Sequence, residues 1–526
     1  MKPIKLLNQM KKIRNSVQCK KEITPTIVSL FSIVLMFLGV LLGCQSTELK
    51  QPNILFIITD DQDAQTLGVY GDTYCDTPNI DKLAWEGLTL TSAHHMGAFR
   101  AAVCTPSRCM LMTGRNVWET QNLNVKWPPL DYTHKVEENY AKISPDDPSY
   151  YSLPALFKRA GYYTFRTCKR GNSYEGANLL FDERYDKTNR DAEDENGSQW
   201  HADKVIDYLN RRIDQPTDQP FLIYLGFSHP HDPRRAKPAL LEKYGAINPG
   251  PPMRPNPKAP KLPINYLPAH PFEEGHPDLR DENSVEGVMT KRDEATVRNE
   301  RGKELAAIEA IDTEIGRVLE KLEATGELDN TYIFFVSDHG IAVGKHGLMG
   351  KQNLYEHSLK IPFIVKGPNI ERNRKAKGNI YLSDVLPTLC DLAGIDIPET
   401  VYGKSFKSVI SGEIETVRDV INGVYSGGTK PGIRSVKKGD WKLIKYDVMD
   451  GEIQKTQLFN LKDNPNELLI EHHDPNVIAL TGNTPKPNQV NLADHPEYTV
   501  KRKEMEALLF AEMKALNDPY RFWDQK

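Results

Sequence analysis

The sequence lacks an excess of charge of either sign. Its 526 residues carry 67 lysines and arginines against 71 aspartates and glutamates, and no extended basic face stands out along the chain. Nucleic-acid-binding proteins usually show such a basic surface, so the composition indicates no nucleic-acid partner. Because the net field is nearly neutral, an anionic substrate would have to be attracted by a local site.

The sequence also shows no internal repeat. Its length exceeds what a single hydrophobic core usually supports, so we expect one large domain and a smaller one. From about Gly403 the pattern changes to short strands and turns, such as Trp441–Tyr446. We therefore predict a large domain over residues 44–400 and a smaller domain over residues 401–526.

A single charge-free apolar run lies near the N-terminus, from Ile27 to Gly43, after a lysine-rich start. This order is typical of a secretory signal, so we predict that residues 1–43 form a signal peptide. The run ends in Leu41-Leu42-Gly43-Cys44, which resembles a bacterial lipobox with Cys44 as the lipidated residue. The alternative is a plain transmembrane anchor, but 17 residues are at the short limit for crossing a bilayer. We expect an exported lipoprotein of the periplasm, outer membrane or cell surface, which meets the membrane only through its lipid anchor.

Three apolar runs, at residues 53–59, 221–227 and 332–337, predict buried strands. Helical stretches lie between them, most clearly from Arg301 to Thr325, where apolar residues share one face. Strands that are apolar on both faces and alternate with helices predict an α/β fold. We expect a large mixed, mostly parallel sheet sandwiched by helices.

Polar side chains follow each of these runs. Asp60-Asp61 follow the first run, Ser228 to His231 follow the second, and Asp338-His339 follow the third. A polar turn after one strand is common. In open α/β sheets, however, ligands collect beyond the carboxyl ends of the strands, so three such turns together predict one shared site.

The segment 245–271 is dense in proline and poor in apolar residues, and a polar stretch continues it to Arg301. This composition predicts no regular structure. The segment is either disordered or a wall over the active-site edge of the sheet, and we favour the wall.

The motif Cys104-Thr105-Pro106-Ser107-Arg108 places a potential nucleophile where a helix begins. Thr105 can cap this helix, and Pro106 suits its first position. The unpaired amides and the positive end of the helix dipole favour an anion beside residue 104, and Arg108 adds donors for a tetrahedral oxyanion. A sulfate or phosphate ester fits this place. Taken alone, the motif is equally compatible with a buried cysteine at an ordinary helix start.

Together with Thr113-Gly114-Arg115, the motif resembles the signature of the formylglycine-dependent sulfatases of the alkaline phosphatase superfamily. The similarity extends from Pro52-Asn53-Ile54-Leu55 to Leu458-Phe459-Asn460-Leu461, and it implies an alkaline phosphatase-like fold with a smaller C-terminal α+β domain. In that family a maturation enzyme oxidises the cysteine to an aldehyde, whose hydrate is the nucleophile. The resemblance therefore implies that Cys104 is a formylglycine precursor and that a formylglycine-generating enzyme is a partner.

Asp60, Asp61 and Asp338 offer the hard oxygen ligands that calcium and magnesium prefer. The resemblance implies a divalent cation at these aspartates, Ca²⁺ before Mg²⁺, with the modified Cys104 and His339 as further ligands. Imidazole is an unusual ligand for calcium, which makes His339 the least typical member of the set.

The resemblance implies five catalytic residues: Cys104, Arg108, Lys169, His231 and Lys351. Lys351 matches the family's second lysine, which binds sulfate and helps the leaving oxygen, and Lys169 matches the family's first lysine. His231 stands in a His-x-Pro position and is the expected general acid. His229 and His346 are expected substrate contacts.

One residue of the family pattern is missing. The usual Lys-Trp-His is replaced by Lys169-Arg170-Gly171, so the histidine that supports the nucleophile is absent from its place. Asn172 and Tyr174 are the expected substitutes.

The seven cysteines do not predict a disulfide. Cys19 leaves with the leader, Cys44 carries lipid and Cys104 is modified, which leaves four. Export permits disulfides, but the sequence does not assign pairs among these four: Cys75, Cys109, Cys168 and Cys390.

We therefore expect a sulfatase that hydrolyses sulfate esters of an extracellular sulfated poly- or oligosaccharide. Three alternatives remain: a phosphodiester or phosphonate monoester hydrolase of the same superfamily, a choline-type small-molecule sulfatase, and a non-catalytic sulfated-glycan-binding protein. The run Ser-His-Pro-His-Asp-Pro resembles choline sulfatases, whereas the export signal and the long insertion favour a larger external glycan. The intact set of acidic and basic site residues argues against a non-catalytic protein.

Overall fold

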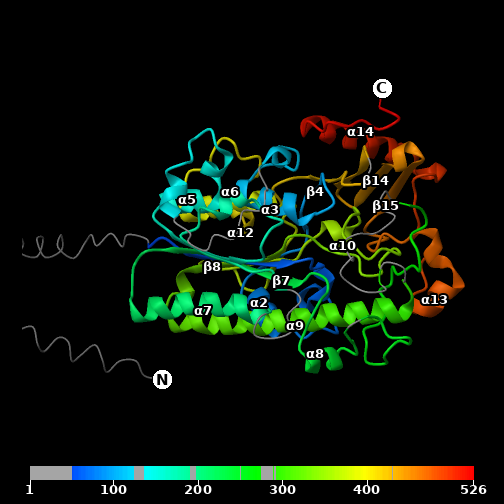
Figure 1. The fold of residues 1–526 in the computed structure, drawn as a ribbon. Helices are drawn as coiled ribbons and strands as arrows, with labels where there is room; N and C mark the ends of the chain where they lie inside the picture. Colours follow the sequence, from blue (N-terminus) through cyan, green and yellow to red (C-terminus); the bar gives the residue numbers. More distant parts are fainter. Residues whose placement is uncertain are drawn as a thin grey trace, which may run out of the picture. The chain divides into compact units, whose positions relative to one another are not determined.

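An eight-stranded sheet forms the centre of the structure, a computed structural model shown in Figure 1. The structure describes residues 50–123, 136–189, 197–248, 250–273, 288, 292–428 and 430–525. The strand order is β10-β2-β9-β8-β1-β7-β5-β6. The strands have these bounds: β1 Asn53–Asp60, β2 Leu88–Leu90, β5 Tyr163–Cys168, β6 Glu183–Asp186, β7 Phe221–Pro230, β8 Thr331–Ser337, β9 Phe363–Lys366 and β10 Arg374–Ala376.

The three predicted strands lie together in the middle of this sheet. β1 lies between β7 and β8 and pairs in parallel with both. β5 and β6 continue the parallel part, whereas β9 pairs antiparallel with β8 and β2. The predicted α/β fold with a mixed, mostly parallel sheet is confirmed.

Side chains of β1 alternate between two layers of helices. Ile54, Phe56 and Ile58 join one hydrophobic core, and Leu55 and Ile57 join the other. The first core contains α3 (Cys104–Thr113), α5 (Leu153–Arg159) and α11 (Val385–Ala393), and the second contains α2 (Pro78–Trp85), α7 (Ser198–Asp214) and α9 (Glu294–Ala324). In Figure 1, α3 and α5 lie above the sheet, and α7 and α9 lie below it.

Helix α9 corrects one prediction, because it begins at Glu294 and not at Arg301. Asp293 caps the helix by accepting a hydrogen bond from the Thr296 amide at 2.8 Å. The first turns contain buried polar side chains such as Glu300, which forms ion pairs with Arg234 and Lys303. The polar composition concealed this part of the helix, since its buried face is held by charge pairs as well as by apolar contacts.

The proline-rich segment carries no helix or strand between residues 250 and 273, apart from an isolated bridge between Tyr266 and Lys345. Leu262 and Tyr266 pack in one cluster with Ile341 and Val343. The segment therefore covers part of the loop that follows β8, as the wall interpretation predicts. Residues 274–287 and 289–291 lie outside the described residues.

A second sheet of five strands has the order β15-β14-β13-β12-β4. Its strands have these bounds: β4 Gly97–Ala98, β12 Val420–Tyr425, β13 Gly432–Lys438, β14 Trp441–Val448 and β15 Ile453–Asn460. Helix α14 (Thr499–Ala515) packs on it through Met505, Leu509 and Met513. Because β4 comes from the segment just before Cys104, this sheet is tied to the helix of the predicted nucleophile. The division of the chain at residue 400 stays a prediction.

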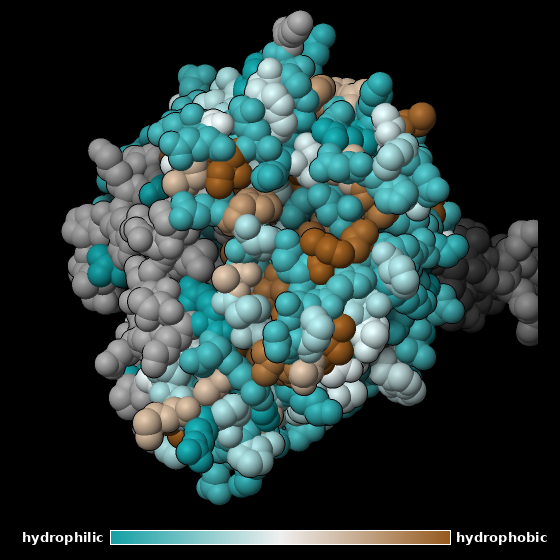
Figure 2. All heavy atoms as spheres, turned by 90° about the vertical axis from the view of Figure 1, so that its right-hand side faces the viewer, coloured by the Kyte–Doolittle hydropathy of each residue, from teal (hydrophilic) through white to brown (hydrophobic). Residues whose placement is uncertain are grey.

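Within the described residues, no helix combines the length and apolarity needed to cross a membrane. The predicted signal peptide and Cys44 lie outside the described part of the chain. The five cysteines that the structure describes are buried and free, so none of them joins a disulfide with another. The side drawn in Figure 2 is mainly hydrophilic, and its hydrophobic residues form small separate groups.

Candidate active site

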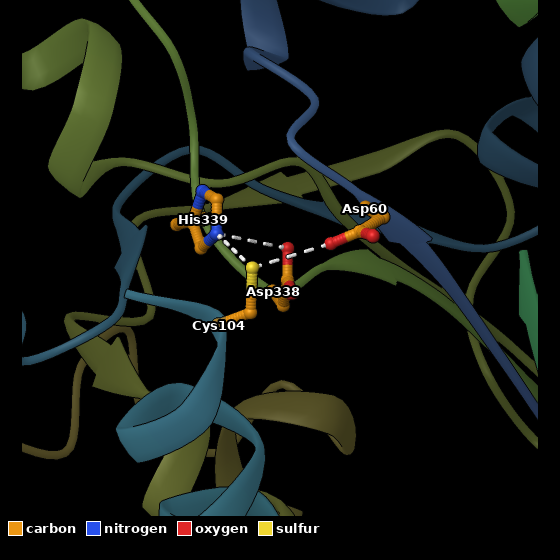
Figure 3. A group of neighbouring side chains, drawn as sticks. All are labelled: Asp60, Cys104, Asp338 and His339. Atoms are coloured by element: carbon orange, nitrogen blue, oxygen red, sulfur yellow. Dashed lines mark hydrogen bonds and ion pairs between the residues drawn. The ribbon is translucent and has the colours of Figure 1, made fainter. Parts of the chain in front are cut away.

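The predicted polar turns after β1 and β8 meet at the carboxyl edge of the large sheet, as Figure 3 shows for three of their residues. Asp60, Asp61, Asp338 and His339 are all buried. The Asp61 amide donates to Asp338 Oδ1 at 3.2 Å, and His339 Nε2 lies 3.2 Å from Asp61 Oδ1. Asp61 adopts a left-handed backbone (φ 66°), a conformation that aspartate tolerates better than most residues. Two of the three strand ends predicted to share one site, those of β1 and β8, therefore lie together.

Helix α3 brings Cys104 to this cluster from the other side. Its Sγ lies 3.4 Å from Asp60 Oδ1, 3.2 Å from His339 Nε2 and 3.7 Å from Lys351 Nζ. Burial raises the pKa of the Cys104 thiol, although Lys169 and Lys351 oppose the shift. The encoded residue is therefore held as a thiol, which is a poor nucleophile.

The start of α3 differs from the prediction. The helix begins at Cys104 itself, after Val103, and no side chain caps it. Thr105 thus lies within the first turn and does not cap the helix, and its hydroxyl donates to Asn172 Oδ1 at 3.5 Å. Ser107, which the sequence did not single out, donates to the main-chain oxygen of Asp338 at 2.5 Å and anchors the helix to the cluster.

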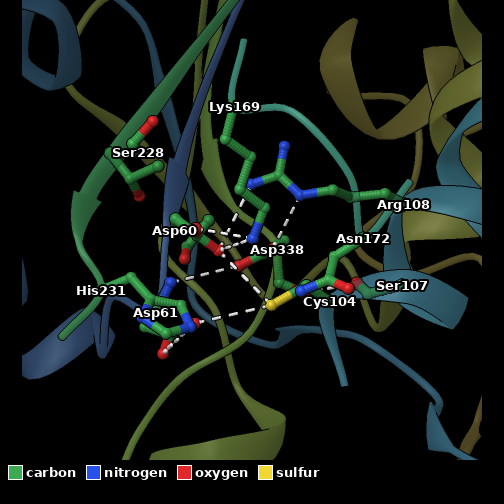
Figure 4. Close-up of polar contacts among 12 residues, drawn as sticks. Asp60, Asp61, Cys104, Ser107, Arg108, Lys169, Asn172, Ser228, His231 and Asp338 are labelled. Carbon is green, nitrogen blue, oxygen red and sulfur yellow. Dashed lines mark hydrogen bonds and ion pairs between the residues drawn. The ribbon is translucent and has the colours of Figure 1, made fainter. Parts of the chain in front are cut away.

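Three cations neutralise the buried carboxylates, and Figure 4 shows Arg108 and Lys169 converging on Asp60 and Asp338. Lys169 Nζ donates to both oxygens of Asp60 at 2.6 Å, and Arg108 Nε donates to Asp338 Oδ2 at 2.9 Å. Burial alone would raise the pKa of Asp60, but Lys169 and other positive groups bring it down to about 2. The carboxylates are therefore charged at neutral pH.

Lys351 neutralises Asp61 in the same way, because its Nζ lies 2.5 Å from Oδ2 of Asp61. Burial opposes its charge, but Asp61 and other negative groups raise the pKa of Lys351 well above its ordinary value. His231 also reaches this aspartate, with Nε2 3.6 Å from Oδ2. The five residues predicted as catalytic are thus brought to one cluster.

The two predicted substrate contacts, His229 and His346, differ in their surroundings from the five predicted catalytic residues. His229 Nδ1 is 3.2 Å from the Ser198 hydroxyl at the start of α7, and the residue lines a cavity of about 300 Å³ between α7, α8 (Pro238–Lys243) and α9. His346 is fully buried, its Nε2 lies 3.0 Å from the main-chain oxygen of Glu467, and its ring stacks on Tyr355 at 3.9 Å. Its observed contacts are packing contacts, and the structure does not place it in the cluster.

Comparison with known proteins identifies the family. A model described as Sulfatase matches residues 52–395, which contain every residue of the cluster. The chain belongs to the sulfatase family. A second model, described as N-sulphoglucosamine sulphohydrolase, C-terminal, matches residues 344–486. This sulfatase is accordingly a sulfuric ester hydrolase of the alkaline phosphatase superfamily, as the sequence predicted.

Individual relatives resemble this sulfatase over most of their length. An arylsulfatase of Clostridium perfringens is 27% identical and covers 80% of this chain and 89% of its own. An N-acetylglucosamine-6-O-sulfatase of Bacteroides thetaiotaomicron is 24% identical and covers 90% of this chain and 88% of its own. A solved structure in complex with its substrate, D-glucosamine-2-N,6-O-disulfate, aligns with a TM-score of 0.64 and 23% identity over 89% of this chain and 99% of that one. The structural likeness shows the shared fold.

The structure shows which residues stand in place of the missing family histidine. Gly171 and Asn172 both adopt a left-handed backbone (φ 78° and 46°), which turns the chain after Lys169. Asn172 lies beside Cys104 in Figure 4 and contacts Thr105 of the same helix. Tyr174 instead packs in the hydrophobic core. Of the two predicted substitutes, the structure brings Asn172 to Cys104.

The arrangement around Arg108 adds two residues that the sequence analysis missed. Arg108 Nη1 donates to the Tyr224 hydroxyl at 3.3 Å and lies 3.2 Å from Cys168 Sγ. Tyr224 lies in β7 and Cys168 ends β5, so both project from strands adjacent in the sheet. The alternation of side chains along β7 would have placed Tyr224 on the sheet face that α3 covers. Its partner, Arg108, is identified only from the pairing of the strands in the structure.

A metal ion would find ligands in this cluster. One ligand atom each from Asp60, Cys104, Asp338 and His339 lies within 4.8 Å of the others. Two members of this set are carboxylates, and a third carboxylate, Asp61, lies within reach of the same cysteine sulfur. Hard divalent cations prefer such oxygen ligands. The donor set fits a divalent cation.

Proposed function

We propose that this sulfatase hydrolyses sulfate esters of a sulfated carbohydrate by means of a formylglycine made from Cys104 and a bound divalent cation, preferably Ca²⁺. One observation carries the proposal: the buried thiol of Cys104 lies within 3.8 Å of Asp60, Asp61, His339 and Lys351, in a cluster that also contains Asp338. Such a thiol is unsuited to act as a thiolate, whereas its position fits an oxygen nucleophile beside a cation.

Asp60, Asp61, Asp338 and His339 would hold the cation, together with an oxygen at position 104, where Sγ of the encoded cysteine now stands. A bound cation supplies charge neutralisation for the sulfate and for the nucleophile. The aldehyde of formylglycine would supply, as its hydrate, the hydroxyl that attacks sulfur; the second hydroxyl would then lose its proton and re-form the aldehyde as the bond from its carbon to the sulfate oxygen breaks and sulfate leaves.

The residues of the chain then divide the remaining work. Arg108 and Lys169 bind the sulfate oxygens and stabilise the charge that grows on them. Lys351 and His231, which both reach Asp61, assist the departure of the alcohol in this proposal. As the sulfur–oxygen bond breaks, its electron pair goes to the alcohol oxygen, which takes a proton from His231 Nε2 or Lys351 Nζ.

Carbohydrate is the preferred substrate class because relatives that cover most of the chain are named for it. One acts on N-acetylglucosamine 6-O-sulfate, and another is bound to D-glucosamine-2-N,6-O-disulfate. The predicted signal peptide at residues 1–43 and lipidated Cys44 extend the proposal to an exported lipoprotein that meets its substrate outside the cytoplasm.

Two measurements test the proposed chemistry. Peptide mass spectrometry of protein produced with a formylglycine-generating enzyme should show Cys104 converted to the aldehyde, and activity should rise with the converted fraction. Full activity in protein whose Cys104 is wholly unmodified would refute the proposed formylglycine nucleophile.

Chelation with EDTA should remove activity, and added Ca²⁺ should restore it better than Mg²⁺. If chelated, metal-free protein retained its rate of sulfate release, the proposed role of the cation would be refuted.

A panel of substrates tests the class. Defined sulfated oligosaccharides should release sulfate, whereas choline sulfate and a phosphonate monoester should be turned over slowly. Preferential hydrolysis of choline sulfate or of the phosphonate would replace the carbohydrate by the corresponding alternative.

A further inference from the structure

Asp232 follows directly after His231 and forms a close pair with it. Asp232 Oδ1 lies 2.6 Å from His231 Nδ1, and the main-chain oxygen of Asp232 lies 3.0 Å from the same nitrogen. Both oxygens are acceptors, so Nδ1 must carry a hydrogen. The hydrogen bond itself goes to the main-chain oxygen, and the carboxylate adds its charge at short range.

The carboxylate of Asp232 has few other partners. It is 1% exposed, and neither of its oxygens has a hydrogen-bond donor with good geometry among the described residues. The nearby Arg234 is paired with Glu300 at 3.1 Å. Burial alone would raise the pKa of Asp232, yet His231 beside it brings the value down to about 2. Arg234 and Lys351 contribute to this lowering after His231, so the imidazole is the nearest and strongest of the positive groups that offset the cost of this buried charge.

The opposite nitrogen of that imidazole faces the catalytic cluster. His231 Nε2 lies 3.6 Å from Asp61 Oδ2, the oxygen that Lys351 also contacts. Figure 4 shows the ring beside Asp61 at the edge of the cluster. The imidazole thus spans the distance from Asp232 to Asp61.

We propose that Asp232 is a positioning residue of the sulfatase reaction, which holds Nδ1 of His231 as a donor and thereby turns Nε2 toward the leaving oxygen. This inference rests on the proposed function. When the sulfur–oxygen bond breaks, the electron pair stays with the alcohol oxygen and the Nε2 proton passes to it. The ring becomes neutral and keeps its remaining proton at Nδ1, between the two Asp232 acceptors.

Leaving groups provide the sharpest distinction. A sugar alcohol departs poorly without a proton, whereas 4-nitrophenolate departs without one. If Asp232 acts through proton delivery, its loss should slow the hydrolysis of sugar sulfates far more than the hydrolysis of 4-nitrophenyl sulfate. A purely structural role would slow both equally.

The test compares Asp232→Asn with wild-type protein on both substrates. We expect kcat/KM for the sugar sulfate to fall by about 10²-fold, in line with the contribution of positioned acid catalysis, and the value for 4-nitrophenyl sulfate to change little. In a His231→Ala background the same substitution should have almost no further effect, because the pair acts as one unit. Equal losses on both substrates, or equal losses in both backgrounds, would overturn the proposal.

Asp312→Asn is the matched control. Asp312 is equally buried, but it accepts hydrogen bonds from the amides of Asn79 and Ile80 at the start of α2. This variant should lose thermal stability without any change in the ratio between the two substrates.

A spectroscopic readout separates this inference from the proposed function. In protein labelled with ¹⁵N-histidine, the His231 resonance, assigned by its loss in His231→Ala, should report a protonated Nδ1 in wild-type protein and a changed Nδ1 signal in Asp232→Asn. An unprotonated Nδ1 in the wild type would overturn the pairing. If no sulfate ester were hydrolysed at all, the proposed function would fail, and this measurement would still decide on the pair.

Discussion

Individual charges in the catalytic cluster are arranged in pairs. Asp60 is held by Lys169, Asp61 by Lys351 and Asp338 by Arg108, all within 2.9 Å. Removing one member leaves its partner buried without compensation, which usually costs several kcal/mol. The pairs therefore keep the carboxylates ionised and in place before any substrate arrives.

Lys169→Ala should lower kcat/KM for sulfate esters by about 10²–10³-fold, because a preorganised cation is lost where charge develops. Steady-state kinetics measures this effect. Arg170→Ala is the control, since Arg170 follows Lys169 directly and pairs through its main chain with Thr188. The role of Lys169 would be contradicted if both variants retained wild-type kinetics.

At the scale of elements, the strands and the end of α9 were predictable, and the starts of α9 and α3 were not. Residues 53–59 form a buried run because β1 has a layer of helices on each face, and that pattern is visible in one dimension. Helix α3 starts at Cys104 without a side-chain cap, and Ser107 in its first turn contacts the main chain of Asp338, a partner far away in sequence. The site residues named by the family motif lie together. Tyr224 and Asp232, in contrast, could be recognised only from the paired strands and the side-chain contacts of the structure.

The C-terminus of α3 offers a test of how tightly that helix is held. Gly114 has φ +65°, and an added Cβ would lie 2.8 Å from the side chain of Val401. Gly394 ends α11 with φ +70° and has open space at the same place. Gly394→Ala should cost about 1–2 kcal/mol of backbone strain alone. Gly114→Ala should cost about 1–3 kcal/mol more, from overpacking.

Denaturant unfolding measures both glycine variants. Equal destabilisation by the two substitutions would show that Val401 yields without cost and that the contact does not constrain α3.

At the scale of the whole molecule, partly buried ion pairs join the second sheet to the segment that follows Lys351. Lys437 of β13 and Lys442 of β14 both contact Glu356, which lies shortly after Lys351, at 2.9 Å. Lys442 also contacts Glu467 at 2.7 Å. The segment that carries Lys351 is thus fixed by charges from the five-stranded sheet, so damage to that sheet should reach the active site.

Acid should destabilise the whole fold, because several histidines are buried in the neutral form. Burial lowers the pKa of His94 and His270 to about 4 and that of His201 to about 3, from an ordinary value of 6.5. The unfolded chain binds protons at these sites near pH 6.5 and the folded chain does not, so stability falls as the pH drops from 6.5 toward 3.

Melting temperatures measured from pH 8 to pH 4 test this linkage. His201→Gln should flatten the decline, whereas His495→Gln, at a half-exposed ring, should leave it unchanged. An identical pH slope in wild-type protein and His201→Gln would contradict the account.

The most direct test of the central claim is sulfate release by the purified, matured protein and by its Cys104→Ala variant, measured on the same set of sulfated oligosaccharides. The wild-type protein should release sulfate from at least one of them, and the variant, folded to the same melting temperature, should release none. Equal release by both proteins would contradict the role of Cys104 as the source of the nucleophile.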